Sequence, residues 1–195
     1  TNYLPGRSLN LGIEQSKGKY IVCLSAHCIP TNNQWLENLV SAIQEDENIA
    51  GVYGRQEPMS FSSPSDKRDL LIVFGLDRKI QVKDSFFHNA NSIIQRTLWE
   101  KIPFDNNITN IEDRLWASEM IKGGYKLIYE PSASVFHYHG IHQNGNNERL
   151  ENVVNIIEGQ ISSSMNANLD ANKLKIVAII PVKGKCISVN GDRKS

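Results

Sequence analysis

Cysteine is scarce in this 195-residue chain, and the three cysteines, Cys23, Cys28 and Cys186, are odd in number. Small secreted domains that depend on disulfides carry many cysteines, usually in even numbers. The sequence also opens without a charged segment followed by an apolar one, which is the pattern of a secretory leader. The composition therefore predicts a protein of the reducing cytoplasm rather than an exported, disulfide-bonded one.

An excess of charge and a long apolar run are missing as well. Lys and Arg together number 21, and so do Asp and Glu, so the formal net charge is zero. A chain without net charge has no global field to attract nucleic acid or anionic lipid, and we expect no nucleic-acid partner. No stretch contains the roughly 18 consecutive apolar residues of a membrane-spanning helix. The sequence thus predicts a cytoplasmic protein and leaves association with the inner face of the membrane open.

Apolar residues recur at helical spacing in some segments and in short continuous runs in others. We expect helices over residues 6–18, 32–47, 96–102, 110–124 and 150–161. We expect buried strands over residues 19–25, 49–54, 86–94, 125–130, 134–139 and 174–181. Residues 57–84 contain several Ser and Pro and are expected to form a mobile loop. Strands that alternate with amphipathic helices are typical of α/β folds with parallel strands, and the length suffices for one well-buried domain.

Two acidic residues stand at the start of an expected helix, in "TNIEDRLW". Thr109 and Glu112 have the spacing of a capping box, in which each side chain bonds to the backbone amide of the other residue. This structural role would account for Glu112 completely. Asp113 lies one residue deeper in the first turn, where the helix dipole favours negative charge, and it could accept a proton from an attacking hydroxyl group. Acidic residues at helix starts are more often caps than catalysts, so both interpretations stay open at this point.

Three histidines follow or end expected strands. His27 comes after the apolar run in "CLSAHCIP", and His137 and His139, two residues apart, project to the same face of another strand. Imidazoles gathered at strand ends can bind a divalent metal. A single histidine is more often a structural residue bonded to backbone, so the sequence allows either a metal site or structural histidines.

The order of these segments resembles glycosyltransferase family 2, the large inverting group with the GT-A fold. The resemblance rests on "GRSLNLGIEQSKGKYIVCLSAHCIP" and "WLENL", followed by "NANSIIQRTLWEKIPF" and "IEDRLWASEMIKGGYKLIYEPSASVFHYH". Its most specific part is the "ED" pair with "LWA" and "GYKLIYEP" at the right offsets, and "AGVYGRQEP" resembles rhamnosyltransferase-like members. The resemblance runs from about residue 6 to residue 139. It implies an α/β fold with a mixed, Rossmann-like sheet flanked by helices.

The same resemblance implies a reaction and a site. A sugar of hexosyl or rhamnosyl type would pass with inversion from a nucleotide-diphosphate donor to a glycan or lipid-linked acceptor, with a divalent metal, Mn²⁺ or Mg²⁺, as cofactor. Asp113 would be the catalytic base and Glu112 its neighbour at the acceptor, while His27, His137 and His139 would bind the metal or the diphosphate. The implied substrate-binding residues are Arg7, Asn10, Arg55, Gln56, Asn89, Asn91 and Trp116.

Two features depart from the family pattern. Where the family usually has Asp-x-Asp, this chain has Ser25, Ala26 and His27, so an imidazole replaces a metal-binding carboxylate. Imidazole can bind Mn²⁺ but suits Mg²⁺ poorly. The family also begins with a strand and an Asp-rich turn that hold the nucleotide base. We expect the transferase domain, residues 1–164, to be truncated at its N-terminus and to lack them.

The C-terminal segment has a resemblance of its own. After an expected linker over residues 165–173, residues 174–195 resemble the start of CMP-sugar cytidylyltransferases. In that case Lys183 and Lys185 would face nucleotide phosphates. The alternative is a terminal strand followed by a solvated basic tail.

The sequence is compatible with two functional classes other than a transferase. The missing aspartates and first strand would fit a non-catalytic sugar- or nucleotide-binding remnant of the same fold. The acidic pair and the histidines would also permit a metal-dependent hydrolase. No second cluster of carboxylates and histidines in the sequence supports the hydrolase.

Overall fold

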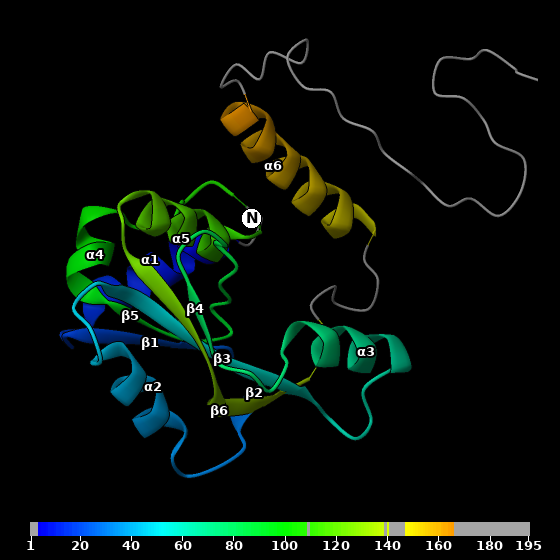
Figure 1. The fold of residues 1–195 in the computed structure, drawn as a ribbon. Coiled ribbons are helices and arrows are strands. Elements are labelled where there is room, and N and C mark those ends of the chain that lie inside the picture. Colours follow the sequence, from blue (N-terminus) through cyan, green and yellow to red (C-terminus); the bar gives the residue numbers. More distant parts are fainter. Residues whose placement is uncertain (1–3, 109, 139, 141–146, 166–195) are drawn as a thin grey trace, which may run out of the picture. The chain divides into compact units, whose positions relative to one another are not determined.

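The computed structural model describes residues 4–108, 110–138, 140 and 147–165, and Figure 1 shows how their helices and strands are arranged. The helices are α1 (Pro5–Gln15), α2 (Trp35–Ile43), α3 (Pro64–Val73), α4 (Arg96–Lys101), α5 (Glu112–Lys122) and α6 (Asn147–Met165). The strands are β1 (Tyr20–Leu24), β2 (Cys28–Pro30), β3 (Ile49–Pro58), β4 (Lys79–Gln81), β5 (Asn91–Gln95) and β6 (Lys126–His137). The strand expected over residues 174–181, with Lys183 and Lys185 after it, lies outside the described residues.

The strands form one six-stranded mixed sheet. Its order is β1-β5-β3-β6-β2, and β4 pairs with β6 beside this path. Among the described strands only β3 and β6 pair in parallel, and the other pairs are antiparallel. The mixed sheet implied by the family resemblance is confirmed, whereas the mainly parallel sheet expected from strand and helix alternation is wrong. One reason is that the chain forms α3 and β4 after β3 and then enters β5 from the edge at which β3 ended, so β5 runs antiparallel to β3.

Helices cover both faces of this sheet (Figure 1). On one face, Leu39 and Ile43 of α2 pack in a cluster with Val52, Ile93 and Ile128 of the strands. A larger core on the other face lies under α1, α4 and α5. The residues that these three helices contribute to it are Ile13, Leu98, Trp99, Trp116, Ala117 and Met120. Burial of both apolar faces stabilises the sheet and leaves one edge of it for polar residues.

The segment expected to be a mobile loop contains regular structure. β3 continues to Pro58, α3 follows, and β4 then pairs antiparallel with β6. Helix α3 has a regular N-cap. The Ser63 side chain accepts a hydrogen bond from the Asp66 backbone amide, and Pro64 lies in the first turn. The expectation is therefore wrong. Ser and Pro mark the start of a helix as readily as they mark a loop.

Strand β6 spans 12 residues where two shorter strands were expected. Pro131 lies inside it and has no amide to donate. The pairing with β3 shifts register between Gly54 and Gln56, so the proline lies close to an irregularity in the ladder. The strand therefore continues through the proline and carries His137 to the edge where β3 ends, opposite Pro58.

The chain separates into two compact units, Thr1–Ile157 and Glu158–Ser195. The hydrophobic clusters of the described residues all lie in the first unit. The expected linker and C-terminal domain begin where the described residues end, so those limits stay predictions. Within the part of the chain that the structure describes, no helix is both long and apolar enough to cross a membrane.

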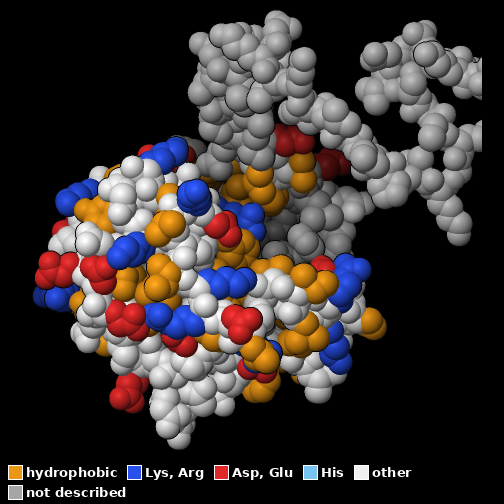
Figure 2. Space-filling model, in the orientation of Figure 1, with side chains coloured by type: hydrophobic (Ala, Val, Ile, Leu, Met, Phe, Trp, Pro, Cys, Tyr) orange, Lys and Arg blue, Asp and Glu red, His pale blue; other side chains and the backbone are white. Residues whose placement is uncertain are grey.

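Charged side chains of both signs are interspersed over the face shown in Figure 2. Among the described residues, Arg78 forms ion pairs with Glu45 at 2.7 Å and with Glu130 at 2.9 Å. The described part of this face shows no continuous patch of one sign, in agreement with the zero net charge of the sequence.

Candidate active site at one edge of the sheet

Four strands bring predicted site residues to one edge of the sheet. By this edge we mean the side at which strands end or begin, not an outer strand. β1, β3 and β6 end at this edge, and β5, which is antiparallel to β1 and β3, begins there. His27 follows β1, Gln56 lies near the end of β3, and His137 ends β6. His88 and Asn89 come just before β5. Strand ends are the usual ligand-binding edge of α/β sheets, so the topology gathers residues that are far apart in the chain.

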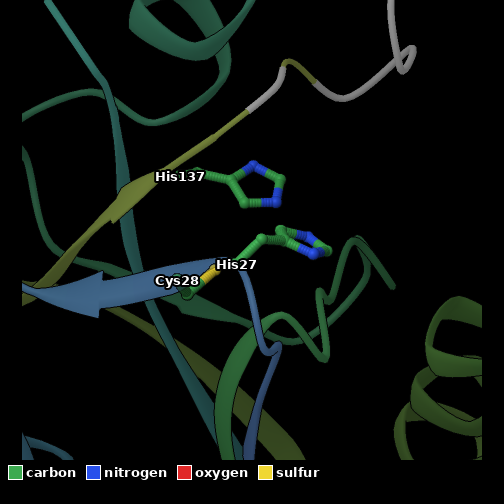
Figure 3. Close-up of side chains that lie close together, drawn as sticks. All are labelled: His27, Cys28 and His137. Atoms are coloured by element: carbon green, nitrogen blue, oxygen red, sulfur yellow. The ribbon is translucent and has the colours of Figure 1, made fainter.

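His27, Cys28 and His137 form a compact group (Figure 3). One donor atom from each residue lies within 4.8 Å of the others, and the two imidazole centroids are 4.9 Å apart. Cys28 pairs with His137 across β2 and β6, and the Tyr138 amide donates to the His27 carbonyl at 3.3 Å. The structure thus brings together two of the three predicted metal ligands. The third, His139, lies outside the described residues.

Two imidazoles and a thiol are a donor set that fits a divalent transition metal. Mg²⁺, which takes oxygen ligands, fits this set poorly. Burial raises the pKa of the Cys28 thiol to about 12, so sulfur carries its proton near neutral pH unless a metal displaces it. The sequence prediction did not include Cys28 as a ligand. Its place next to His27 was the available signal, but the pairing with His137 becomes visible only in the sheet.

His88 is a further histidine at this edge, and it was not among the predicted site residues. Its ring lies edge-on to that of His137, with centroids 6.4 Å apart. Its Nδ1 accepts a hydrogen bond from the Ala90 amide at 3.3 Å. His88 therefore borders the group of His27, Cys28 and His137 from the β5 side, and its position directly before Asn89 was the only hint in the sequence.

Asp113 and Glu112 lie in the first turn of α5, and both are buried. One carboxylate oxygen of Asp113 accepts a hydrogen bond from the backbone amide of Asn89 at 2.9 Å, and the other accepts one from the backbone amide of Arg114 at 2.8 Å. Asn89 follows His88 in the chain, and His88 contacts His137. The short segment before β5 therefore joins the predicted base to the predicted metal ligands.

The predicted capping box at the start of α5 is wrong. The N-cap is Ile111, so Glu112 is the first helical residue rather than the third, and Thr109 lies outside the described residues. Ile111 has a φ of 57°, in the left-handed region. A β-branched side chain rarely adopts this conformation, which costs about 1–2 kcal/mol. Strain of this kind is frequent at active sites, and here it immediately precedes the two carboxylates.

Three predicted substrate-binding residues carry buried polar atoms to which no described residue forms a hydrogen bond. They are both polar side-chain atoms of Gln56, the side-chain nitrogen of Asn89 and the indole nitrogen of Trp116. Because unsatisfied buried polar groups are rare and costly, these atoms are candidates for contacts with a bound molecule. The Trp116 ring itself belongs to the core, where it packs between Phe87 and Phe104.

The side chains of Asn91 and Asn10, also predicted to bind substrate, form hydrogen bonds within the protein. Asn91 is fully buried, its side-chain nitrogen donates to the Ala133 carbonyl at 2.8 Å, and its oxygen accepts from the Trp35 indole at 2.8 Å. Asn10 joins α1 to α4 and the segment after it through similar bonds. These side chains use their polar atoms within the protein, which favours a structural role over the expected binding of substrate.

The two predicted arginines have different surroundings. The Arg55 guanidinium donates to the Phe74 carbonyl and to the Glu57 carboxylate, both at 3.3 Å, and so links β3 to the C-terminus of α3. Arg7 is exposed and lines a surface depression that also borders Pro103. A role in substrate binding stays a prediction for both.

A family model described as glycosyl transferase family 2 matches residues 1–102. Over 130 residues the chain is 29% identical to the O-antigen chain rhamnosyltransferase WbaN of Salmonella anatum, which covers 62% of this chain and 41% of that protein. Over 146 residues it is 27% identical to the O-antigen chain rhamnosyltransferase RfbN of Salmonella typhimurium, which covers 69% of this chain and 46% of that protein. The chain thus spans less than half the length of these relatives.

Two solved structures share the fold. One is the mannosyltransferase PcManGT of Pyrobaculum calidifontis in complex with GDP-Man and Mn²⁺, with a TM-score of 0.57, 17% identity, and coverage of 84% of this chain and 44% of that chain. The other is GalNAc-T7 with UDP, GalNAc and Mn²⁺, with a TM-score of 0.55, 18% identity, and coverage of 79% and 34% respectively. These similarities confirm the expected α/β fold of the GT-A type.

Proposed function

This chain belongs to glycosyl transferase family 2, and from that premise we propose that it is an inverting glycosyltransferase. The donor is a nucleotide-diphosphate sugar, and the acceptor is a hydroxyl group of a glycan or a lipid-linked glycan. Both curated relatives carry the name rhamnosyltransferase, which supports a rhamnosyl or related hexosyl group as the transferred sugar. Membership of the family favours a working transferase over a non-catalytic remnant of the fold.

The observation that carries the proposal is the position of Asp113. Its buried carboxylate lies at the start of α5, with one oxygen held by the Asn89 amide at 2.9 Å. In the proposed reaction this carboxylate takes the proton of the acceptor hydroxyl while the acceptor oxygen bonds to the anomeric carbon. The bond from that carbon to the diphosphate breaks on the opposite face, which inverts the configuration. Glu112, the preceding residue, contacts the acceptor in this proposal.

Donor binding is assigned to the neighbouring strand ends. His27 and His137 would hold a divalent metal, which when bound would supply positive charge to stabilise the leaving diphosphate. The close approach of these donors supports the assignment (Figure 3). Gln56 and Asn89 would hydrogen-bond to the donor, because their buried side chains carry polar atoms without a partner among the described residues.

Replacement of Asp113 by Asn tests the proposed base. Asparagine keeps one oxygen that can accept the backbone amide of Asn89, loses the acceptor for the Arg114 amide, and cannot take a proton. We therefore expect the fold to persist and the rate of transfer to fall at least about 100-fold. The assay supplies UDP- and dTDP-linked sugars, rhamnose among them, together with a lipid-linked glycan acceptor. Mass spectrometry follows the product, and NMR reports its anomeric configuration.

Glu119→Gln on the same helix is the matched control. Glu119 is exposed and pairs with Lys122 at 2.6 Å, so this variant loses one carboxylate of α5 away from Asp113 and should transfer at the wild-type rate. Transfer by Asp113→Asn above about a tenth of the wild-type rate would show that Asp113 is not the base. A product with retained configuration would contradict the inverting mechanism.

A further inference from the structure

We propose that Cys28 is the third protein ligand of the metal held by His27 and His137. The site would then offer two nitrogens and one sulfur, and it would take Zn²⁺ or Co²⁺ in preference to Mn²⁺ or Mg²⁺. This inference rests on the metal site of the proposed function and adds to it the identity of the metal. The preference follows from the sulfur, because thiolates bind softer transition ions, whereas Mg²⁺ and Mn²⁺ favour carboxylates, carbonyls and water.

The distances suit tetrahedral coordination. Zinc bonds of about 2.3 Å to sulfur and about 2.0–2.1 Å to nitrogen place neighbouring donors roughly 3.3–3.7 Å apart. The donor atoms of the three residues already lie within 4.8 Å of one another. Closure around an ion therefore needs movements of about 1 Å, which small changes of side-chain torsions supply. Figure 3 shows the two rings one above the other, beside the Cys28 sulfur.

Hydrogen bonds already order the backbone that carries these ligands. Cys28 and His137 are directly paired across β2 and β6. The Cys28 amide closes the preceding turn on the Ser25 carbonyl at 2.9 Å, and the His27 carbonyl accepts the Tyr138 amide at 3.3 Å. Ligands on a frame of this kind are held close to the binding geometry before the metal arrives.

Binding of the metal to the three ligands releases one proton. As the bond from sulfur to metal forms, the Cys28 thiol releases its proton to solvent, and both imidazoles bind through neutral nitrogens. The exposed His27 side chain gives solvent a route to the group. Three protein ligands leave the fourth tetrahedral position open, as in catalytic zinc sites, and an oxygen of the donor diphosphate could occupy it.

Cys23 offers an internal control. It is buried like Cys28, but it lies on β1 opposite Ser92 of β5 and is not part of the His27, Cys28 and His137 group. Because the chain contains three cysteines, a Cys186→Ser background leaves these two as the only thiols. The two can then be compared one at a time.

Titration of the full chain with Co²⁺ tests the inference, in the Cys186→Ser background and without a histidine tag. We expect a thiolate-to-cobalt charge-transfer band together with the d–d bands of tetrahedral Co²⁺. Cys28→Ser should abolish the charge-transfer band, and Cys23→Ser should leave it unchanged. In competition experiments Cys28→Ser should weaken Zn²⁺ binding at least about 10-fold, since even the loss of a residue that only orients a ligand costs about that much. Binding of Mn²⁺ should change little.

X-ray absorption of the zinc-loaded wild-type chain gives a measurement that needs no substitution at Cys28. We expect one sulfur at about 2.3 Å and nitrogens at about 2.0 Å from the ion. The inference therefore remains testable even if Cys28→Ser fails to fold.

The outcomes separate this inference from the proposed function. A shell of nitrogen and oxygen alone, with d–d bands that require His27 and His137, would overturn the role of Cys28 and leave the metal-dependent transferase standing. Failure of the wild-type chain to bind Co²⁺ or Zn²⁺ would overturn both the role of Cys28 and the metal part of the proposed function. The transfer assay with Asp113→Asn reports on the base independently of these spectra.

Discussion

Gln56 and Gln81 are both buried, at 1% and 6% exposure, but their hydrogen bonding differs. No described residue bonds to either polar atom of the Gln56 side chain. The Gln81 side-chain nitrogen donates to the carbonyls of Asp84 and Phe86 at 2.8 and 3.0 Å. The Gln81 oxygen, like both polar atoms of Gln56, has no hydrogen-bond partner among the described residues. Both polar atoms of Gln56 are thus available to a ligand, while the Gln81 nitrogen holds the segment that leads to His88.

Substitution of these glutamines by leucine should change stability in opposite directions. Gln56→Leu removes two unsatisfied polar atoms, and we expect the free energy of unfolding to rise by about 1–3 kcal/mol. Gln81→Leu removes one unsatisfied oxygen but leaves two carbonyls without their donor, so we expect a net fall of about 1 kcal/mol. Urea denaturation measures both changes, and the KM for the donor should rise in Gln56→Leu alone. A loss of stability in Gln56→Leu would mean that this amide is already satisfied.

Substitutions at His27 distinguish a metal ligand from a structural histidine. Aspartate offers an oxygen, so His27→Asp should retain transfer with its metal preference shifted toward Mg²⁺ and Mn²⁺. His27→Ala should lose metal dependence and most of the activity. Initial rates with each ion, after removal of bound metal, provide the measurement. A histidine that only bonds to backbone would instead cost about 1 kcal/mol of stability and leave the metal preference unchanged.

Helix α1 lies very close to the segment after α4, and two of its glycines differ in this contact. A Cβ at Gly6 would lie 2.0 Å from the Asp105 carbonyl oxygen, whereas a Cβ at Gly12 would meet nothing within 4 Å. The segment matters because it continues toward Ile111 and Asp113.

Alanine at these two positions should therefore have opposite effects. Gly6→Ala should force the helix away from the segment and lower the free energy of unfolding by about 1–3 kcal/mol. Gly12→Ala restricts the unfolded chain and improves helix propensity, so it should raise that free energy by about 0.5–1 kcal/mol. Thermal or urea unfolding of both variants measures the difference. Equal stability of the two would show that the contact at Gly6 yields without cost.

The interior of the molecule as a whole keeps several weak acids neutral. Burial raises the pKa of Tyr53 and of Tyr129 above the ordinary range of tyrosine, and it raises the pKa of Cys23 to about 12. Below the unfolded-state pKa values, about 8.5 for Cys and 10 for Tyr, these groups are neutral in both states and their contribution to stability is complete. At higher pH the unfolded chain ionises first, so stability is lost as pH rises through the folded-state values.

We therefore expect cooperative alkaline unfolding that begins above about pH 10, the ordinary pKa of tyrosine. Phenolate absorbance from Tyr53 and Tyr129 should appear together with the loss of secondary structure measured by circular dichroism. Tyr53→Phe removes one of these acids and should move the midpoint to higher pH. Ionisation of both tyrosines in the folded protein near their ordinary pKa would contradict this account.

Local patterns were sufficient to predict much of the architecture. Apolar spacing predicted α2 and α5, and continuous apolar runs predicted β1 and β3, because each pattern depends on residues a few positions apart. The order of motifs along the chain indicated the family, and with it Asp113 and His27. Composition misled at residues 57–84, where a serine cap and a proline begin α3. The spacing of Thr109 and Glu112 misled at α5, where a strained Ile111 is the N-cap in place of the expected capping box.

The sequence by itself determined the described helices apart from α3, most of the buried strands and the family, because these follow from local periodicity and motif order. Only the tertiary structure decided which segments meet. The antiparallel entry of β5 brings Asn89 to Asp113, and the pairing of β2 with β6 brings Cys28 to His137. The tertiary structure also distinguished the roles of two buried amides. The polar atoms of Asn91 bond to neighbouring parts of the protein, whereas no described residue bonds to the polar atoms of Gln56. Such contacts depend on how apolar faces pack over long sequence separations, and spacing along the chain carries no record of that packing.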